Sequence, residues 1–518
     1  MKYIKYLSIL IFVVGFFLLR PYHMQETGLM YSGDDEGYFA HASSLVFFQF
    51  PSYENESYSW GEGMPMHSIG PGLMASPFVM FFSLLDRINK ADIIKKRKRA
   101  NIYNSWSLFG FVIASLFFFY SGCILLYLGL KFYFNYKISF FAVVLMILFQ
   151  GFPLYVFRRP VFAHIYEFFL MSVIVYLVLK NNKTYFLDKF NMWITVGIGV
   201  IIGLIPLVRY NNLAMVFVVP IILYCFRENN FNFKKNLKHL IYVYGTAFLI
   251  LLIFKVYPLL LYGENYSSII KSRLFILYHP IVYIKRIAHI FLGIDWGLIF
   301  TAPFAVIGLF SLFLIKEDKL KNVLLLLLLP IIINLYIVIV WGTQAGWYGY
   351  RYLVFSLAPA VVYPFAKIIR LFTARYGYKK FYIFVFTVSL FPLLSMLVFE
   401  GNPANLTLHI IVDYFNNVGS GANEWGNKFY QVEVWKTLIF NPLQFIIASF
   451  KGGMLYIVYI FALIFKLIKF LPQVILEKYQ VFRVDIFIKT LIIYIFPFLM
   501  YFIIKKLNLI KEVEEQES

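Results

Sequence analysis

The sequence predicts an all-α, polytopic membrane protein of about 13 transmembrane spans, and two observations support this. Hydrophobic residues make up 61% of the 518 residues and charged residues only 14%, a balance far from that of soluble domains. Apolar runs of roughly 20 residues, enough to cross a bilayer as a helix, also recur along the chain. We expect helices because a lipid-exposed strand would leave backbone groups unpaired. The expected spans are 4–19, 105–130, 138–156, 161–179, 192–207, 213–226, 240–261, 297–315, 323–340, 353–371, 381–399, 454–470 and 486–504.

The first apolar run follows Lys2 and Lys5, and no small-residue cleavage site comes after it. We therefore expect an uncleaved signal anchor with a cytoplasmic amino end, which places the next segment outside. Cys123 and Cys225 lie inside apolar runs, which favours buried thiols over a disulfide framework. The formal net charge is +21, which in so apolar a chain fits cytoplasmic loops and anionic lipid. We expect no nucleic-acid partner.

Two long segments interrupt the expected spans. The first, 20–104, contains an apolar stretch at 73–85 and a basic cluster at 95–99, and the second, 400–451, is polar and rich in Asn and Gly. If 73–85 crosses the membrane, the basic cluster is cytoplasmic; if it lies on the membrane surface, the cluster is external. Basic residues between 87 and 238 are shared almost equally between the two sides in either topology, so the positive-inside rule does not choose.

Three consecutive carboxylates, Asp34, Asp35 and Glu36, follow the first span closely. Adjacent carboxylates resist being ionised together, and a raised pKa suits a general base or a metal site. A solvated acidic turn is the alternative interpretation. No Lys or Arg lies between Pro21 and Ile69, which isolates these acids in a basic chain. We take the three carboxylates as candidate catalytic residues.

Several basic side chains are candidate partners of these acids. Arg209 lies between two apolar runs, where a guanidinium either snorkels to the interface or pairs with an anion. Arg351 begins a span among aromatic residues, so it is either a ligand or part of an interfacial aromatic belt. His164 and Glu167 lie i,i+3 on one helical face, just after Arg159, and could be a structural pair. No Walker, Rossmann, zincin or cysteine metal-binding pattern occurs in the sequence, so nothing favours a nucleotide site.

These motifs, in their order, resemble the GT-C class of membrane glycosyltransferases, which includes protein O-mannosyltransferases and lipid A aminoarabinose transferases. Residues 33–38 are similar to the acidic motif and downstream Tyr of the class, and 67–78 are similar to its Gly/Pro-rich return to the membrane. The runs 295–303 and 341–359 resemble the late Pro and Gly-x-Arg-Tyr-Leu segments of the class. The acidic motif fits either Asp34-Asp35 or Asp35-Glu36, so the resemblance leaves the base undecided.

The resemblance implies a domain organisation. Residues 1–399 form a GT-C-like transmembrane catalytic module that includes the external loop 20–104, and 400–518 form an external loop followed by C-terminal transmembrane helices. It also implies that 73–85 belongs to external juxtamembrane helices and that the basic cluster after it is external.

The implied function is transfer of a sugar from a polyprenyl-phosphate donor to a glycan, lipid or protein acceptor on the outer face of the bacterial cytoplasmic membrane. A carboxylate of the acidic motif would act as the base, while cations would bind the donor phosphate. The expected phosphate-binding residues are Arg209, Arg351, Lys95, Lys96 and Arg97. Further expected pocket residues are Tyr38, His67, Arg159, His164 and Glu167.

Two other functions stay open on the sequence. An O-antigen polymerase or ligase would also have many helices, but we would expect its catalytic loop late in the chain. A transporter or flippase would carry charges near helix midpoints, or broken helices in paired halves. No cofactor is implied with certainty. A divalent metal is possible for the class, and the sequence leaves metal dependence undecided.

Overall fold

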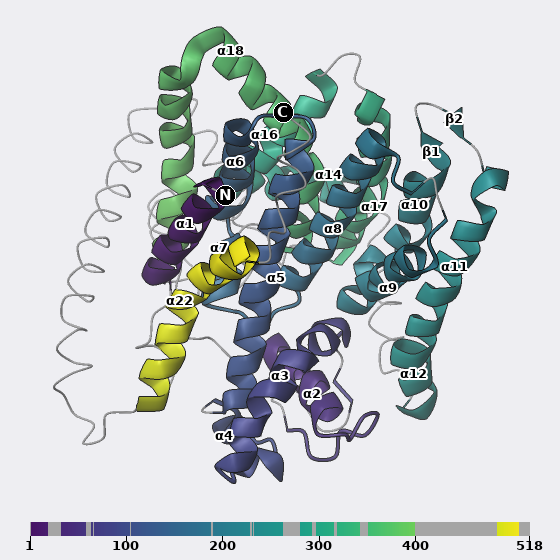
Figure 1. Cartoon of the computed structure of the whole chain (residues 1–518), viewed down its shortest axis with the longest axis vertical. Helices are drawn as coiled ribbons and strands as arrows, with labels where there is room; N and C mark the ends of the chain where they lie inside the picture. The colour runs from purple at the N-terminus through teal and green to yellow at the C-terminus, as the bar shows by residue number, and fades with distance from the viewer. Residues whose placement is uncertain are drawn as a thin grey trace.

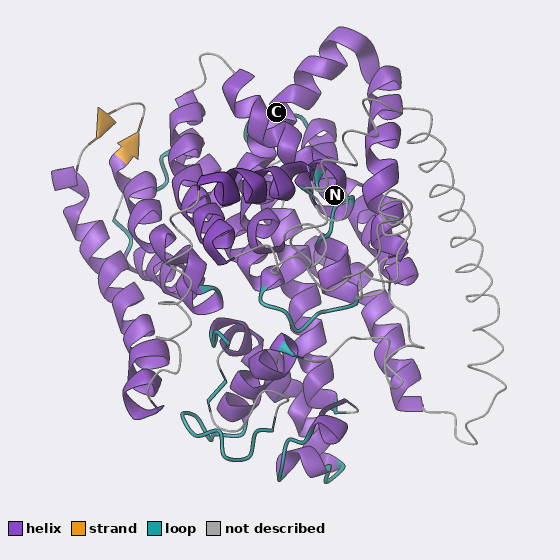
Figure 2. Ribbon diagram, turned by 180° about the vertical axis from the view of Figure 1, so that it is seen from behind, coloured by secondary structure: helices purple, strands orange, loops and turns teal. Residues whose placement is uncertain are grey.

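The computed structural model describes residues 2–18, 33–57, 64–65, 67–103, 105–187, 190–227, 230–231, 233–262, 280–292, 297–314, 319–341, 351–398 and 484–506. Within these residues the chain is a bundle of helices (Figure 1). One small exception is the antiparallel hairpin of β1 (Phe226–Arg227) and β2 (Asn230–Phe231), drawn in orange in Figure 2. The predicted all-α class is therefore confirmed for this part of the chain.

The helices follow the apolar runs of the sequence. The elements of the first half are α1 (Lys2–Leu18), α2 (Asp34–Val46), α3 (Gly70–Ile88), η1 (Asp92–Ile94), α4 (Arg99–Tyr103), α5 (Trp106–Lys131), α6 (Tyr136–Val143), η2 (Val144–Leu148), α7 (Phe152–Phe157), α8 (His164–Thr184), α9 (Met192–Val208), η3 (Tyr210–Asn212) and α10 (Leu213–Cys225). Those of the second half are α11 (Phe233–Leu251), η4 (Leu252–Val256), α12 (Tyr257–Tyr262), α14 (Pro280–Leu292), α15 (Leu298–Thr301), α16 (Pro303–Leu314), α17 (Lys319–Trp341), α18 (Arg351–Val398) and α22 (Val484–Lys506).

The predicted count of 13 spans is not confirmed. Five helices in the described residues are long and apolar enough to cross a membrane: Trp106–Lys131, His164–Thr184, Asn236–Val256, Arg351–Ser389 and Ile488–Lys506. Several shorter apolar helices accompany them, such as Met192–Val208. This set of long apolar helices indicates an integral membrane protein. The expected span 454–470 and the polar segment 400–451 lie outside the described residues.

Three of the predicted spans illustrate a local structure that differs from the one expected. The run 138–156 is not one continuous helix, since α6 passes into the π-helical turn η2 before α7 begins. The runs 353–371 and 381–399 both belong to α18, where Gly377 with φ 76° joins two helical arms at the bend that forms the top of Figure 1. Glycine suits this bend because it has no Cβ to oppose a positive φ.

Helices α2, α3 and α4 gather below the bundle beside the first turns of α5 (Figure 1). Helix α3 packs antiparallel to α5, with Phe82 stacked on Trp106 and Phe78 against Phe117. The two helices approach closely at Gly110, where an added Cβ would lie 2.7 Å from the carbonyl oxygen of Phe78. Helix α3 is not among the candidate membrane-spanning helices.

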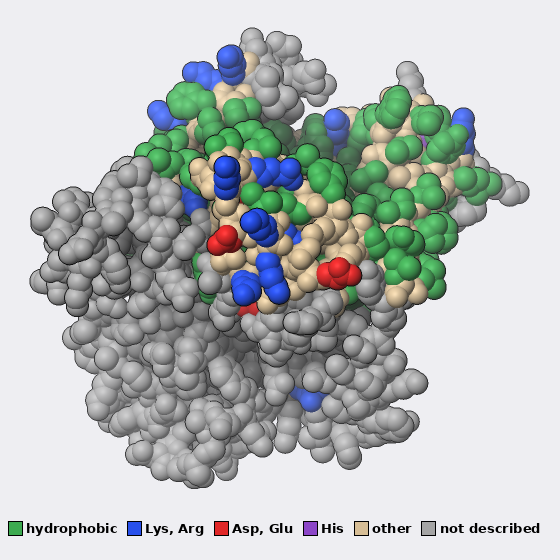
Figure 3. Space-filling view, turned by 90° about the horizontal axis from the view of Figure 1, so that it is seen from below, with side chains coloured by type: hydrophobic (Ala, Val, Ile, Leu, Met, Phe, Trp, Pro, Cys, Tyr) green, Lys and Arg blue, Asp and Glu red, His purple; other side chains and the backbone are tan. Residues whose placement is uncertain are grey.

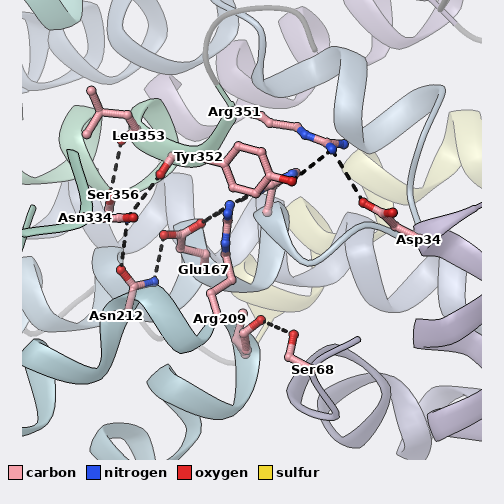
Figure 4. A network of polar contacts seen from close by, with 12 residues as sticks. Asp34, Ser68, Glu167, Arg209, Asn212, Asn334, Arg351, Tyr352, Leu353 and Ser356 are labelled. Atoms are coloured by element: carbon pink, nitrogen blue, oxygen red, sulfur yellow. Dashed lines mark hydrogen bonds and ion pairs between the residues drawn. The ribbon is translucent and has the colours of Figure 1, made fainter. Parts of the chain in front are cut away.

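Helices that run up and down the bundle bring distant segments of the chain together at the end that faces α2 and α3. Helix α8 leaves this end, α9 returns to it, and α18 starts from it, so that residues near 164, 209 and 351 lie close together (Figure 4). We call it the site end, and the opposite end, where α18 bends, the distal end.

Candidate functional site

Asp34 begins α2 and points toward the start of α18. Gly33, with φ 66°, caps the helix. One carboxylate oxygen of Asp34 accepts a hydrogen bond from His67 Nε2 at 3.3 Å, and the other lies 3.5 Å from Arg351 Nη2 (Figure 4). Burial raises the pKa of the Asp34 carboxyl, but His67, Arg351 and Arg159 outweigh it and hold that pKa well below its ordinary range. Asp34 is therefore ionised, and its side chain is 35% exposed.

Asp35 and Glu36 turn the other way on the same helix. The Asp35 side chain is fully buried and accepts from Nε and Nη2 of Arg159, both at 3.1 Å. Glu36 is also buried. Successive helical residues are about 100° apart around the axis, so the three carboxylates point in different directions, and only the Asp34 side chain among them is not buried.

Arg209 lies between α9 and η3 and is paired inside the protein. Its Nη1 donates to Nδ1 of His164 at 2.7 Å and to Glu167 at 3.2 Å. Glu167 also accepts from the side-chain amide of Asn212 at 2.8 Å (Figure 4). His164 and Glu167 are 3.9 Å apart, so both contact Arg209 more closely than each other. Of the two interpretations of Arg209, snorkelling and pairing with an anion, the contact with Glu167 favours pairing.

Two aromatic rings lie among the three site arginines. The guanidinium carbons of Arg159 and Arg351 are 4.3 and 4.9 Å from the centre of the Phe162 ring. Those of Arg351 and Arg209 are 5.0 and 4.1 Å from the centre of the Tyr352 ring. Contact with an aromatic face stabilises a guanidinium without neutralising it. The rings therefore let three cations lie close together while they keep their positive charge.

Glycines of α2 and of the Gly/Pro-rich return segment lie in close contact with other parts of the protein. A Cβ on Gly37 would lie 2.1 Å from His67 Nδ1, and one on Gly70 would lie 2.3 Å from the backbone nitrogen of Val208. Ser68 Oγ donates to the Val208 carbonyl at 2.6 Å (Figure 4). These small residues seat the His67 segment against α2 and the end of α9, next to Arg209.

His41 and Tyr53 belong to the site surroundings, although sequence reasoning missed them. His41 Nε2 lies 2.9 Å from the carbonyl oxygen of His67, which can only accept, so this nitrogen carries the proton. Nδ1 of His41 then accepts from the Tyr53 hydroxyl at 2.8 Å. Burial lowers the pKa of His41 to about 3, which keeps the ring neutral. The sequence feature that could have indicated His41 is its position seven residues after Asp34, on the same short helix as the acidic motif.

Of the remaining predicted residues, Tyr38 lies beside the site, whereas the basic cluster lies in the loop between α3 and α4. Tyr38 is half-buried, with its ring edge-on to His67 at 5.3 Å between centroids. Arg97 is fully buried, and its Nε donates to Glu56 at 2.5 Å. Lys95 and Lys96 are exposed. Lys and Arg side chains gather on the face seen from below in Figure 3. We therefore leave Arg97 out of the phosphate site proposed below.

The described residues cover the late motifs only in part. The motif residues 295–296 and 342–350 lie outside the described ranges, whereas Arg351 and Tyr352 lie within them. Among the described side chains, no group of three or more His, Cys, Asp and Glu is placed to hold a metal ion.

Comparison with known proteins gives a distant structural likeness. No family model matches the chain, and no curated protein matches its sequence. The chain resembles the oligosaccharyltransferase AglB from Archaeoglobus fulgidus in complex with an inhibitory peptide and a dolichol-phosphate, with 12% identity and a TM-score of 0.43 over 83% of this chain and 59% of that one. It also resembles the Archaeoglobus fulgidus oligosaccharyltransferase in complex with Zn and sulfate, with 15% identity and a TM-score of 0.44 over 82% and 57%. This chain thus covers less than two thirds of the length of either structure.

Proposed function

We propose that this protein is a membrane glycosyltransferase that moves a sugar from a polyprenyl-phosphate donor to a glycan, lipid or protein acceptor. One observation carries the proposal. The first carboxylate of α2 and the first guanidinium of α18, Asp34 and Arg351, lie 3.5 Å apart, although 317 positions separate them in the sequence. Arg159 and Arg209 lie around the same aromatic rings. An accessible carboxylate beside a group of cations provides a proton acceptor next to a phosphate site.

The proposed reaction is a single displacement at the anomeric carbon of the donor sugar. An acceptor hydroxyl gives its proton to the Asp34 carboxylate while its oxygen bonds to that carbon. The bond from the same carbon to the donor phosphate breaks, and its electron pair leaves with the lipid phosphate. Arg351 stabilises the charge that develops on this leaving group, with Arg209 as a second cation nearby. The energy comes from the sugar–phosphate bond, so the scheme requires no nucleotide site.

The placement of the buried charges supports a transferase over a transporter. In the site, His164 and Glu167 lie in the first turn of α8, Arg209 directly after α9, and Arg351 at the start of α18. A transport pathway would be expected to place such charges near helix midpoints. Here they lie at helix ends, where an acceptor and a membrane-bound donor can meet.

The deciding experiment is an assay of membranes from cells that express the chain, supplied with a labelled polyprenyl-phosphate sugar. Release of the lipid phosphate together with transfer of label to an acceptor fraction is the expected result. A matched preparation carrying Asp34→Asn identifies the part of the signal that depends on the site. Uptake of label that requires an ion gradient, without transfer, would instead favour a transporter.

We further propose that the site faces the outside of the cell, because the predicted signal anchor, α1, begins in the cytoplasm and ends outside. Tyr3 in α1 packs on Tyr136 at the start of α6, whereas an added Cβ on Gly15 would contact Phe157 near the site end. Helix α1 therefore begins at the distal end and runs toward the site end. Basic residues of the distal end include Lys2, Lys5, Lys131, Lys137, Lys180, Lys183, Lys319, Lys321, Arg370, Arg375, Lys379 and Lys380. Basic side chains also gather on the face shown in Figure 3, so the positive-inside rule does not choose between the two ends, and the orientation rests on the direction of α1.

This orientation predicts opposite labelling at two exposed lysines. In a background with Cys123 and Cys225 replaced by Ala, Lys96→Cys should react with an impermeant thiol reagent on intact cells, because Lys96 is exposed in the loop between α3 and α4, at the site end. Lys183→Cys, in the last turn of α8 at the distal end, should react only after the cells are permeabilised. The reverse pattern would place the site in the cytoplasm and contradict the outward assignment.

The proposed phosphate role predicts that lysine cannot replace Arg351. A guanidinium offers several donors to a phosphate, whereas an ammonium offers only a point charge on a flexible stem. Arg351→Lys should weaken use of the donor by about 1.5 to 3 kcal/mol, the range for hydrogen bonds to charged groups. Arg209→Lys should have a smaller effect on donor use, since Arg209 already pairs with Glu167 and His164.

The measurement is kcat/KM with varied donor, at expression levels equal to wild type. Wild-type donor kinetics in Arg351→Lys would show that Arg351 serves only as an interfacial anchor. Equal losses in the two variants would show that both arginines contact the phosphate.

A further inference from the structure

The site arginines each contact a carboxylate, but one of the three pairs differs from the others. Arg159 and Asp35 are 3.1 Å apart, and Arg209 and Glu167 are 3.2 Å apart. The side chains of Asp35 and Glu167 are 0% and 1% exposed. An incoming ligand would have to open the protein to separate either pair.

The third pair, Arg351 with Asp34, is longer and more accessible. The two groups are 3.5 Å apart, and the Asp34 side chain is 35% exposed. Asp34 has a second partner in His67, so it does not depend on Arg351 alone. Arg351 also contacts the hydroxyl of Tyr352 at 3.2 Å and lies over two aromatic rings. If the pair separates, Asp34 therefore keeps its contact with His67, and Arg351 keeps its contacts with Tyr352 and Phe162.

A phosphate and a carboxylate compete for the same guanidinium, because each is an anion with two oxygens that can accept hydrogen bonds from it. We propose that Asp34 occupies the place of the donor phosphate on Arg351, and that the arriving phosphate displaces it. The displaced carboxylate becomes available to the acceptor hydroxyl only when the donor is bound. This inference rests on the transferase function proposed above, and it adds an order of events at the same site.

The charges around Asp34 support this order. The groups that act on it are His67 from the segment before α3, Arg351 from α18 and Arg159 from the turn before α8. Together they hold the pKa of Asp34 low, which makes the carboxylate a weak base in the ligand-free protein. When a phosphate neutralises Arg351, one of these positive charges no longer acts on Asp34. Its pKa then rises toward the ordinary range, where proton transfer from an acceptor is more favourable.

The test is a binding measurement in which removal of a site residue strengthens binding. Purified protein in nanodiscs of zwitterionic lipid is titrated with farnesyl phosphate, and farnesol serves as the control for the apolar chain. Asp34→Asn should bind farnesyl phosphate roughly three- to tenfold more tightly than wild type, because the phosphate no longer displaces a partly exposed ion-pair partner. Glu54→Gln, which removes one negative charge from an exposed position in the same loop, should bind as wild type does.

Asp34→Ser provides a second variant without the carboxylate, in case the amide disturbs folding. Equal or weaker binding by both Asp34 variants, with wild-type protein that binds the phosphate and transfers sugar, would overturn the exchange and leave the transferase function standing. Wild-type protein that neither binds farnesyl phosphate nor transfers sugar would instead contradict the proposed function itself. If Glu54→Gln also binds farnesyl phosphate more tightly, the effect comes from the overall charge of the loop, and the proposed exchange of Asp34 for phosphate on Arg351 is wrong.

Discussion

Asp34→Asn should lower the rate of sugar transfer by about 10² or more, the scale expected when a general base is lost. The amide has nearly the shape of the carboxylate and can still contact Arg351 and His67, so the fold should survive the change. It cannot accept the proton of an acceptor hydroxyl. The effect should therefore appear in kcat under saturating donor, with normal amounts of protein in the membrane.

Glu54→Gln is the matched control for this experiment, because Glu54 is an exposed acid of the same loop. Its transfer rate should stay at the wild-type level. A rate near wild type in Asp34→Asn would remove Asp34 from the base role and leave it as a charge partner of Arg351. A large loss in Glu54→Gln would show that the loop responds to charge in general.

Arg209 and Arg351 could be proposed from the sequence because each is a charge next to an apolar run, and Asp34 because it belongs to an acidic motif with no Lys or Arg nearby in the sequence. Burial is costly for such groups, so a charge in that position has few roles. The sequence could not choose between Asp34 and Asp35, since that choice depends on which face of α2 meets Arg159, 124 positions later. It also could not show that Arg351 and Arg209 would share the ring of Tyr352.

The basic cluster at 95–99 shows where charge alone misleads. Lys95 and Lys96 are exposed, as a solvated run predicts, but Arg97 turns inward to Glu56. Glu56 also accepts from Ser43 at 2.7 Å, so this acid of the first loop holds two parts of the loop together. Neither its spacing from Arg97 nor the apolar pattern around it predicts such a pair, because Glu56 and Arg97 lie in loop segments that meet at an isolated β-bridge.

The apolar pattern predicted where helices occur better than where they end or bend. The runs 353–371 and 381–399 are separated by polar residues that looked like a loop, yet α18 continues through them with one bend at Gly377. Helix-forming residues such as Arg375, Lys379 and Lys380 flank that glycine, which allows both arms to stay helical. Hydrophobic stretches therefore predict the positions of helices more reliably than local polar residues predict the turns between them.

Asp35→Asn should act mainly on stability, with a loss of about 3 to 5 kcal/mol, because it leaves the buried guanidinium of Arg159 without its charged partner. Asp35 is fully buried, and Arg159 donates to it through two nitrogens. A shifted thermal unfolding midpoint of the purified protein in detergent would measure the effect. The double variant Asp35→Asn with Arg159→Met removes the uncompensated charge and should regain much of the lost stability, since a buried ion pair can often be replaced by apolar groups at little cost. If Asp35→Asn instead unfolds at the wild-type temperature and transfers no sugar, then Asp35 takes part in the chemistry, and the division of roles between the two aspartates proposed here is wrong.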